Sequence, residues 1–264
     1  MKFTKMQGLG NDYLYVWGPP PAGVAELSVR LSDRHFGPGA DGMIFIEPSA
    51  KADFRMRIFN ADGSEAKMCG NGIRCVGKYV HDKGYTRKTR LTVETGAGLR
   101  SLTLHVEDGK VTAAAVDMGM ATVAPEKPLK LSDGGVTCTP VDVGNPHAVL
   151  FVPDAEAAPL TTLGPVIEHH PAFPGGVNVE FVQVIDPHTL RMRVWERGSG
   201  VTMACGTGSC ASVAAAVVKG FCPAGEPVAV RLDGGTLTVT VAADGAVRMM
   251  GPAEFVYEGD TEIC

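Results

Sequence analysis

Two cysteines, each at the start of a glycine-rich segment, are the residues best suited to chemistry in this chain of 264 residues. Cys69 opens the segment Cys-Gly-Asn-Gly, and Cys205 opens Cys-Gly-Thr-Gly. If a helix begins at each, its first backbone N–H groups lack partners and carry about half a positive charge, and glycine lets a ligand approach them. We therefore expect each segment to bind a carboxylate and to lower the pKa of its cysteine from about 8.5 toward neutrality.

Two such thiols on opposite sides of one substrate carbon favour one reaction above others. One thiolate removes a proton from the carbon, and the opposite thiol returns a proton to the other face. This is stereoinversion by two-base catalysis, and it requires no cofactor. The spacings Cys69-x5-Cys75 and Cys205-x4-Cys210 do not match those of zinc ligands, so we expect no metal. The other cysteines are interpreted as small buried apolar residues: Cys75, Cys138, Cys210, Cys222 and Cys264.

An internal repeat sets Cys69 and Cys205 apart from the remaining cysteines. Residues 54–84 align without a gap on residues 190–220, at an offset of 136, with eight identities where composition would give roughly two. We infer two homologous lobes. The N-terminal lobe is residues 1–116, completed by a C-terminal strand within 251–264, and the C-terminal lobe is residues 117–250.

Each lobe repeats a strand, a loop, the Cys-Gly-x-Gly segment and a helix. Residues 54–58 and 190–194 alternate apolar and polar side chains, as a half-buried strand does, and residues 211–218 are apolar or small all round, so their helix must be enclosed. Gly84 and Gly220 are placed to end the two helices. Further strands with little other helix are expected at residues 43–47, 91–95, 101–106, 111–118, 136–143, 148–152, 179–185, 228–232, 236–241 and 255–257. The fold class predicted is α+β, with each lobe a curved, mostly antiparallel sheet wrapped around a central helix.

Composition excludes several classes of protein. Apolar residues make up 45% and charged residues 20% of the chain, as in ordinary globular proteins. The net charge is −5, and no basic run exceeds Arg87-Lys88, so neither nucleic acid nor an anionic membrane is an expected partner. No leader-like apolar segment and no 18-residue apolar run is present, so we expect a soluble, cytoplasmic protein.

Several motifs together resemble the diaminopimelate epimerase family, and the resemblance covers the whole chain. They are Lys5-Met-Gln-Gly-Leu-Gly-Asn-Asp12, Asn60-Ala-Asp-Gly-Ser-Glu65, Met68-Cys-Gly-Asn-Gly-Ile-Arg-Cys75, Gly144-Asn-Pro-His147, Glu196-Arg-Gly-Ser-Gly200 and Ala204-Cys-Gly-Thr-Gly208. The related proline racemase and hydroxyproline epimerase group usually has histidine after the first Cys-Gly. Asn71 stands there, which favours the diaminopimelate branch.

The resemblance implies a cofactor-independent interconversion of LL- and meso-2,6-diaminoheptanedioate, a step toward lysine and peptidoglycan precursors. Cys69 and Cys205 would be the proton donor and acceptor pair, with His147 and Glu196 supporting them, and the family tends toward homodimers. The small-molecule substrate would be bound by Asn11, Asn60, Gly70, Asn71, Asn145, Asn178, Glu196, Arg197, Gly206 and Thr207. Among these, Arg197 suits the distal carboxylate through its bidentate guanidinium.

Two positions depart from the family pattern, and two other functions stay open. Gly42 stands where many members have glutamine, and Val201 where glutamate is common. One alternative is a proline- or hydroxyproline-type racemase on the same fold, which differs in the substrate that exchanges its α-proton. The other is a thiol redox protein in which Cys69 and Cys205 form a reversible disulfide, without proton exchange.

Overall fold

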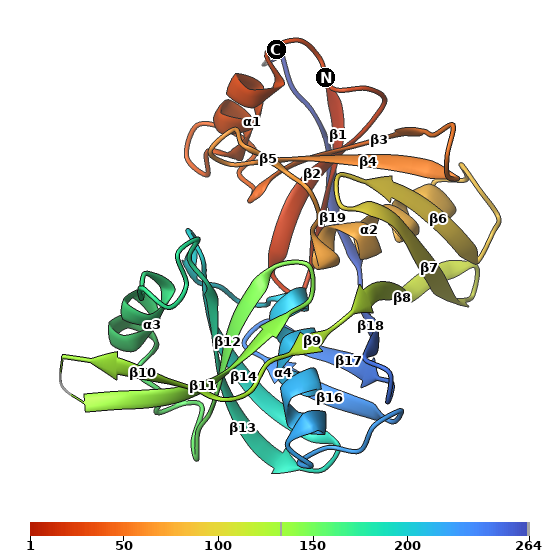
Figure 1. Ribbon diagram of the computed structural model, residues 1–264. Helices are drawn as coiled ribbons and strands as arrows, with labels where there is room; N and C mark the ends of the chain where they lie inside the picture. Colours follow the sequence, from red (N-terminus) through yellow and green to blue (C-terminus); the bar gives the residue numbers. More distant parts are fainter. Residues whose placement is uncertain (133, 263–264) are drawn as a thin grey trace. The chain divides into compact units, whose positions relative to one another are not determined.

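The computed structural model describes residues 1–132 and 134–262, so Cys264 lies outside the described residues. The chain divides into two compact units. The N-terminal unit comprises residues 1–117 and the segment that begins at Gly251, and the C-terminal unit comprises residues 118–250. Each unit contains a sheet, a helix enclosed by that sheet and a second helix on the sheet's other face (Figure 1). This is the α+β organisation predicted.

In the N-terminal unit, neighbouring strands are antiparallel except for the parallel pairs β2–β3 and β4–β6. Helix α2 contacts β1, β2 and β7. The elements are β1 (Lys2–Gly8), β2 (Asn11–Trp17), α1 (Val24–Ser32), β3 (Gly42–Pro48), β4 (Phe54–Asn60), β5 (Glu65–Ala66), α2 (Gly70–Asp82), β6 (Arg90–Thr95), β7 (Gly98–Glu107), β8 (Lys110–Met120) and β19 (Glu254–Asp260).

The C-terminal unit repeats this order, with parallel pairs β12–β13 and β14–β16. Helix α4 contacts strands along the whole sheet, from β11 to β17, and is therefore enclosed. The elements are β9 (Thr122–Val123), β10 (Lys127–Leu131), β11 (Gly134–Asp142), β12 (Pro146–Phe151), α3 (Leu160–Glu168), β13 (Asn178–Asp186), β14 (Thr189–Glu196), β15 (Gly200–Val201), α4 (Gly206–Val218), β16 (Pro227–Leu232), β17 (Gly235–Val241) and β18 (Ala246–Pro252).

The sequence pattern explains the elements that carry the two cysteines. On β4 the alternate residues Phe54, Met56 and Ile58 are buried, and the corresponding apolar residues of β14 are buried in the same way. Gly84 and Gly220 follow α2 and α4 with φ values of 82° and 73°, the left-handed conformation that ends a helix and favours glycine. These predictions are confirmed.

The expectation of little other helix was wrong, because α1 and α3 were missed. Leu27 and Leu31 of α1 are buried against β3 and β4, and Leu160 and Ile167 of α3 are buried against β13. Pro165 lies inside α3, and such a residue normally argues against a helix. The repeat would have found them, since both helices sit at the same offset of 136 as α2 and α4.

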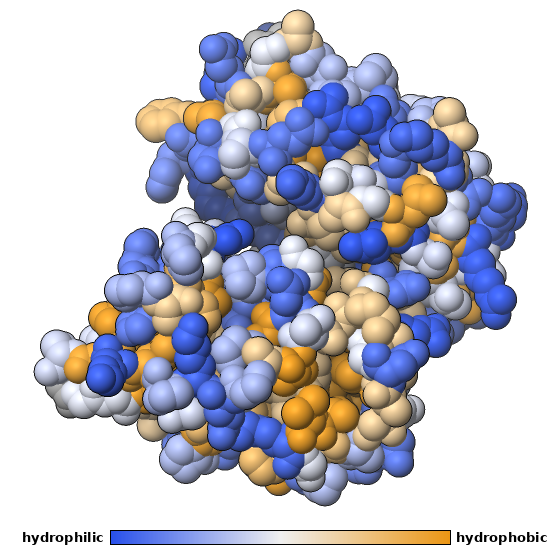
Figure 2. Space-filling model, viewed as in Figure 1, coloured by the Kyte–Doolittle hydropathy of each residue, from blue (hydrophilic) through white to orange (hydrophobic). Residues whose placement is uncertain are grey.

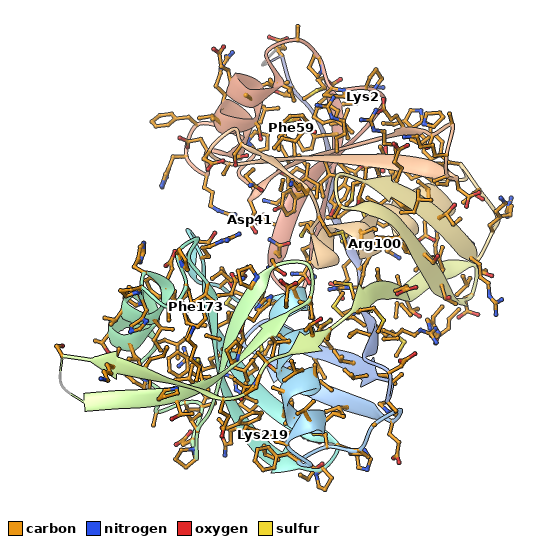
Figure 3. The ribbon with its side chains drawn as sticks, in the orientation of Figure 1. Lys2, Asp41, Phe59, Arg100, Phe173 and Lys219 are labelled. Atoms are coloured by element: carbon orange, nitrogen blue, oxygen red, sulfur yellow. The ribbon has the colours of Figure 1, made fainter. Side chains whose placement is uncertain are left out.

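The surface mixes hydrophilic residues with smaller apolar areas over the face in view (Figure 2). Lys219, at the end of α4 and labelled in Figure 3, places its Nζ 5.7 Å and 5.8 Å from the ring centroids of Phe151 and Phe221, a cation–π arrangement. No helix within the described part of the chain is long and apolar enough to cross a membrane.

Candidate active site

Cys69 is the N-cap residue of α2. Its backbone is extended (φ −138°, ψ 116°), and its Sγ accepts a hydrogen bond from Gly72 N at 3.3 Å. Helical hydrogen bonding begins where Ile73 N donates to Cys69 O, so the amides of Gly70 and Asn71 come before the first helical donor. The sequence prediction that this cysteine stands at a helix start is confirmed.

The Asn11 side chain contacts the Cys69 thiol. Cys69 Sγ donates to Asn11 Oδ1 at 3.3 Å, and Asn11 Nδ2 donates to Asp41 Oδ2 at 2.7 Å. Asp41, labelled in Figure 3, also accepts from Asp12 N and lies 3.0 Å from the guanidinium of Arg34. The carboxylate of Asp41 therefore fixes the amide that faces the thiol.

The two carboxyl groups of this network differ in pKa. Burial, followed by the neighbouring Asp12 charge, raises the pKa of Asp41. Burial would also raise the pKa of Asp12, but hydrogen bonds from Arg34 and Lys5 outweigh it and hold that pKa below its ordinary value. As the pH falls, Asp41 is therefore protonated before Asp12.

The other predicted residues of the N-terminal unit are held by local contacts. The Asn71 side chain is buried, and its Oδ1 accepts from Arg74 at 2.9 Å, which leaves its backbone as the part suited to a ligand. Asn60 ends β4, and its Nδ2 donates to Ser64 Oγ at 3.1 Å within a turn. Gly42 has no room for a side chain, because a Cβ there would lie 2.2 Å from the Phe59 carbonyl oxygen.

Cys205 is the N-cap of α4 and reproduces the geometry of Cys69. Its φ and ψ are −122° and 112°, and its Sγ accepts from Gly208 N at 3.4 Å. The Thr207 hydroxyl lies 3.6 Å from the same sulfur. Ser209 N donates to Cys205 O, so the amides of Gly206 and Thr207 precede the helical ladder.

The expected lowering of the cysteine pKa is wrong for Cys205. Burial, and then the carboxylates of Glu196 and Glu180, raise the pKa of this thiol well above its ordinary value. These effects outweigh the Gly208 N–H and the Thr207 hydroxyl, both of which favour the thiolate. Burial also raises the pKa of Glu196, although hydrogen bonds from Thr202 and the Cys205 thiol oppose it. Within the C-terminal unit, Cys205 therefore holds its proton.

Asn145 and His147 are brought to the same helix start. Asn145 Nδ2 donates to Thr207 Oγ1 at 3.3 Å, and its Oδ1 lies 3.1 Å from His147 Nε2. The other ring nitrogen, Nδ1, lies 2.6 Å from Glu180 Oε1, and both side chains of that pair are fully buried. Three predicted residues, Asn145, His147 and Thr207, are thus connected at the start of the helix that carries the Cys205 thiol.

Asn178 and Arg197 form a separate contact. Asn178 Oδ1 accepts from Arg197 N at 3.0 Å, and its Nδ2 donates to Pro146 O at 3.1 Å. The Arg197 guanidinium donates to Gly175 O at 3.1 Å, and the residue is exposed. Asn178 therefore positions the segment that carries Arg197.

Glu180 and Asp41 were missed in the sequence. Glu180 lies within the apolar run Asn178-Val-Glu-Phe-Val182 of β13, and all five residues are buried. A carboxylate in such a run signals a buried partner, which here is His147. Asp41 belongs to the segment Gly39-Ala-Asp-Gly42, in which only Gly42 was singled out from the sequence.

No group of metal-ligating side chains is found within residues 1–132 and 134–262. The six cysteines described are all thiols, and none is paired with another.

Solved structures of low sequence identity show the class of fold to which these units belong. A probable proline racemase from Agrobacterium radiobacter matches with a TM-score of 0.78 and 19% identity, covering 100% of this chain and 93% of that chain. A PhzF-family phenazine biosynthesis protein from Bacillus anthracis also gives 0.78, at 17% identity, covering 100% and 99%. This is the two-lobed fold of racemases, epimerases and PhzF proteins.

Comparison with sequence relatives identifies the family within this fold. The family model described as diaminopimelate epimerase matches residues 3–124 and 139–256. Diaminopimelate epimerases from Acetivibrio thermocellus and Bacteroides thetaiotaomicron are 47% and 49% identical to this chain. The alignments cover 100% and 99% of this chain and 99% and 98% of the relatives, respectively. The chain belongs to the diaminopimelate epimerase family and is an enzyme of the isomerase class.

Proposed function

We propose that this chain interconverts LL- and meso-2,6-diaminoheptanedioate with Cys69 and Cys205 as its two acid–base groups and without a cofactor. The observation that carries the proposal is the duplicated geometry: each cysteine caps a helix, and each sulfur accepts from the amide three residues on. Family membership at 47–49% identity over the full length supplies the substrate.

The two cysteines can account for both proton transfers of the reaction without any further acid or base. A thiolate takes the α-proton, the electron pair stays on the carbon and its carboxylate, and the thiol on the opposite face delivers its own proton. The two sulfurs have then exchanged protonation states. The raised pKa of Cys205 suits the role of proton donor, because this thiol enters the reaction protonated.

The helix starts would hold the reacting carboxylate. Amides of Gly70 and Asn71, and of Gly206 and Thr207, precede the helical hydrogen bonds and can donate to carboxylate oxygens, which also stabilises charge that develops during deprotonation. Asn11 accepts from the Cys69 thiol, and Asn145 donates to the Thr207 hydroxyl that lies beside Cys205.

The distal end of the substrate carries an ammonium and a carboxylate. We assign its carboxylate to the exposed Arg197 and its polar contacts to Asn60, Asn178 and Glu196. His147 and Glu196 support the cysteines, Glu196 through its hydrogen bond with Cys205. The enzyme would act in the cytoplasm, as a homodimer, in lysine and peptidoglycan precursor synthesis.

The decisive experiment is incubation with the LL isomer in D₂O, without added cofactor, following α-deuterium and the meso product. Cys69→Ala and Cys205→Ala should each lower the rate about 10²–10⁴-fold, the range of a general acid or base. Cys138→Ala is the control, because this buried thiol lies on β11, outside either helix start. Most of the activity surviving in either catalytic variant would refute the proposal, and exchange with proline alone would favour the racemase alternative.

A further inference from the structure

Glu180 and His147 form a buried pair at positions that are occupied by uncharged residues in the N-terminal unit. With the repeat offset of 136, Glu180 corresponds to Ile44 of the N-terminal unit, and the first-turn glycine Gly208 corresponds to Gly72. Gly72 packs on Ile44 as Gly208 packs on Glu180, each at 2.7 Å for an added Cβ. The same scaffold is therefore built with an isoleucine in one unit and a carboxylate in the other.

The histidine has an uncharged counterpart as well. In the parallel strand pairs, Tyr15 is paired with Ile44 and Val149 with Glu180, so His147 corresponds to Tyr13. The fold thus does not require a charged pair at these positions. In addition, Glu180 Oε2 is buried and has no hydrogen-bond partner among the described residues, a desolvation cost that packing alone does not explain.

The contacts from Glu180 lead to the thiol in an ordered chain. Glu180 Oε1 lies 2.6 Å from His147 Nδ1, and His147 Nε2 lies 3.1 Å from Asn145 Oδ1. Asn145 Nδ2 donates to Thr207 Oγ1 at 3.3 Å. In this arrangement the Thr207 hydroxyl does not donate to Asn145, and the Cys205 thiol donates to Glu196, so the hydroxyl hydrogen is available for Cys205 Sγ at 3.6 Å.

The donor and acceptor roles along this series of hydrogen bonds depend on the protonation of the Glu180–His147 pair. Asn145 can donate to Thr207 and accept from His147 only if Nε2 carries a hydrogen, and the remaining hydrogen of the pair then lies between Nδ1 and Glu180 Oε1. A neutral histidine with a bare Nε2 would favour the reversed amide, and the Thr207 hydroxyl would then donate to Asn145 instead of the sulfur.

We propose that Glu180 is a positioning residue of the epimerase: through His147 and Asn145 it keeps the Thr207 hydroxyl as a hydrogen-bond donor to Cys205. The inference rests on the proposed catalytic role of Cys205. The Thr207 hydroxyl then stabilises the thiolate that forms each time Cys205 gives up its proton.

The test is a double-mutant cycle on kcat and KM with the LL substrate. Thr207→Val keeps the backbone amide and should lower kcat about 10- to 100-fold with little change in KM, the loss of a hydrogen bond to a charged group. Thr207→Ser should restore most of the rate. Glu180→Gln should lower kcat about tenfold, and the Glu180→Gln, Thr207→Val double variant should be no slower than Thr207→Val alone, because both act through one chain.

Asp82→Asn is the matched control. Asp82 is another buried carboxylate, paired with Lys78 at 2.8 Å, at the far end of α2 from Cys69. It should lower the unfolding temperature and leave kcat unchanged.

The double variant His147→Tyr, Glu180→Ile, which introduces the residues found at these positions in the N-terminal unit, separates a loss of activity from a loss of folding. It should fold with an unfolding temperature close to that of the wild type and be at least as slow as Thr207→Val. The inference is overturned by additive losses in the cycle, by full activity of Glu180→Gln or by near wild-type activity of the His147→Tyr, Glu180→Ile variant. If Cys205→Ala is itself active, the proposed function fails instead.

Discussion

Gly208→Ala and Gly72→Ala are equivalent substitutions in the two repeats. Comparing them tests whether the start of α4 packs on a fixed carboxylate while the start of α2 packs on a movable apolar side chain. An added Cβ at Gly208 would lie 2.7 Å from Glu180 Oε1, and one at Gly72 would lie 2.7 Å from Ile44 Cδ1. Both distances are too short, so a neighbour must move. The end of an isoleucine can rotate away, whereas the carboxylate is held by His147 at 2.6 Å.

The magnitudes separate the two variants. Alanine is favoured over glycine in a helix by about 1 kcal/mol, and overpacking costs about 1–3 kcal/mol. For Gly72→Ala these terms nearly cancel. For Gly208→Ala, displacing Glu180 from His147 adds the loss of a charged hydrogen bond, about 1.5–3 kcal/mol, so we expect a net loss of about 2 kcal/mol or more.

The assay is thermal unfolding followed by circular dichroism, together with kcat. Gly208→Ala should unfold about 5 °C lower than the wild type, at about 2–4 °C per kcal/mol. It should also lose at least about tenfold in kcat, because a displaced Glu180 no longer orders His147 and the contacts that lead to Cys205. Equal unfolding temperatures for the two alanine variants would refute the reasoning, since the carboxylate would then yield as easily as a methyl group.

Three further predictions concern charge and backbone. Glu196→Gln should lower the raised pKa of Cys205 by removing a neighbouring carboxylate, so iodoacetamide should label Cys205 faster at mildly alkaline pH by mass spectrometry; an unchanged rate would contradict the assigned cause. Asp12 has a lowered pKa, so its contribution to stability is present above its ordinary value of 3.8 and is lost as pH falls through the folded value. Asp12→Asn should therefore be less stable than the wild type in urea at about pH 7, with a gap that narrows as the pH falls below 3.8, and a constant gap would count against it. Gly42→Ala should lose about 3 kcal/mol of unfolding free energy in urea, because its φ is 154° and the new Cβ would collide with Phe59 O; a wild-type midpoint would show that the start of β3 adapts.

The cysteines and their helices could be predicted because their signals are local. Cys-Gly-x-Gly, a following apolar helix and a terminal glycine lie within a few residues of one another, and the repeat presents them twice. Helices α1 and α3 are short and carry only a few apolar positions each. The signal was there all the same: Val24, Leu27 and Leu31 recur, 136 residues later, as Leu160, Leu163 and Ile167.

The chemistry around Cys205 could not be predicted in the same way. Its raised pKa comes from burial and from Glu180 and Glu196, and Glu180 reaches His147 only because β12 and β13 are parallel neighbours. Helix-start arguments account for the amide of Gly208 but not for carboxylates brought in by other strands. The local sequence thus predicts where the thiol lies, whereas the pKa of that thiol depends on residues that tertiary packing brings next to it.

The divergence of the duplicated units has a kinetic consequence. The Cys69 thiol donates to the uncharged amide of Asn11, whereas Cys205 donates to the carboxylate of Glu196, the residue that corresponds to Asn60 in the repeat. Two sulfurs in unlike surroundings hold hydrogen with unlike vibrational stiffness. Turnover begun from the LL isomer and turnover begun from the meso isomer should therefore show different solvent isotope effects, although the overall equilibrium between the two isomers is set by the molecules alone.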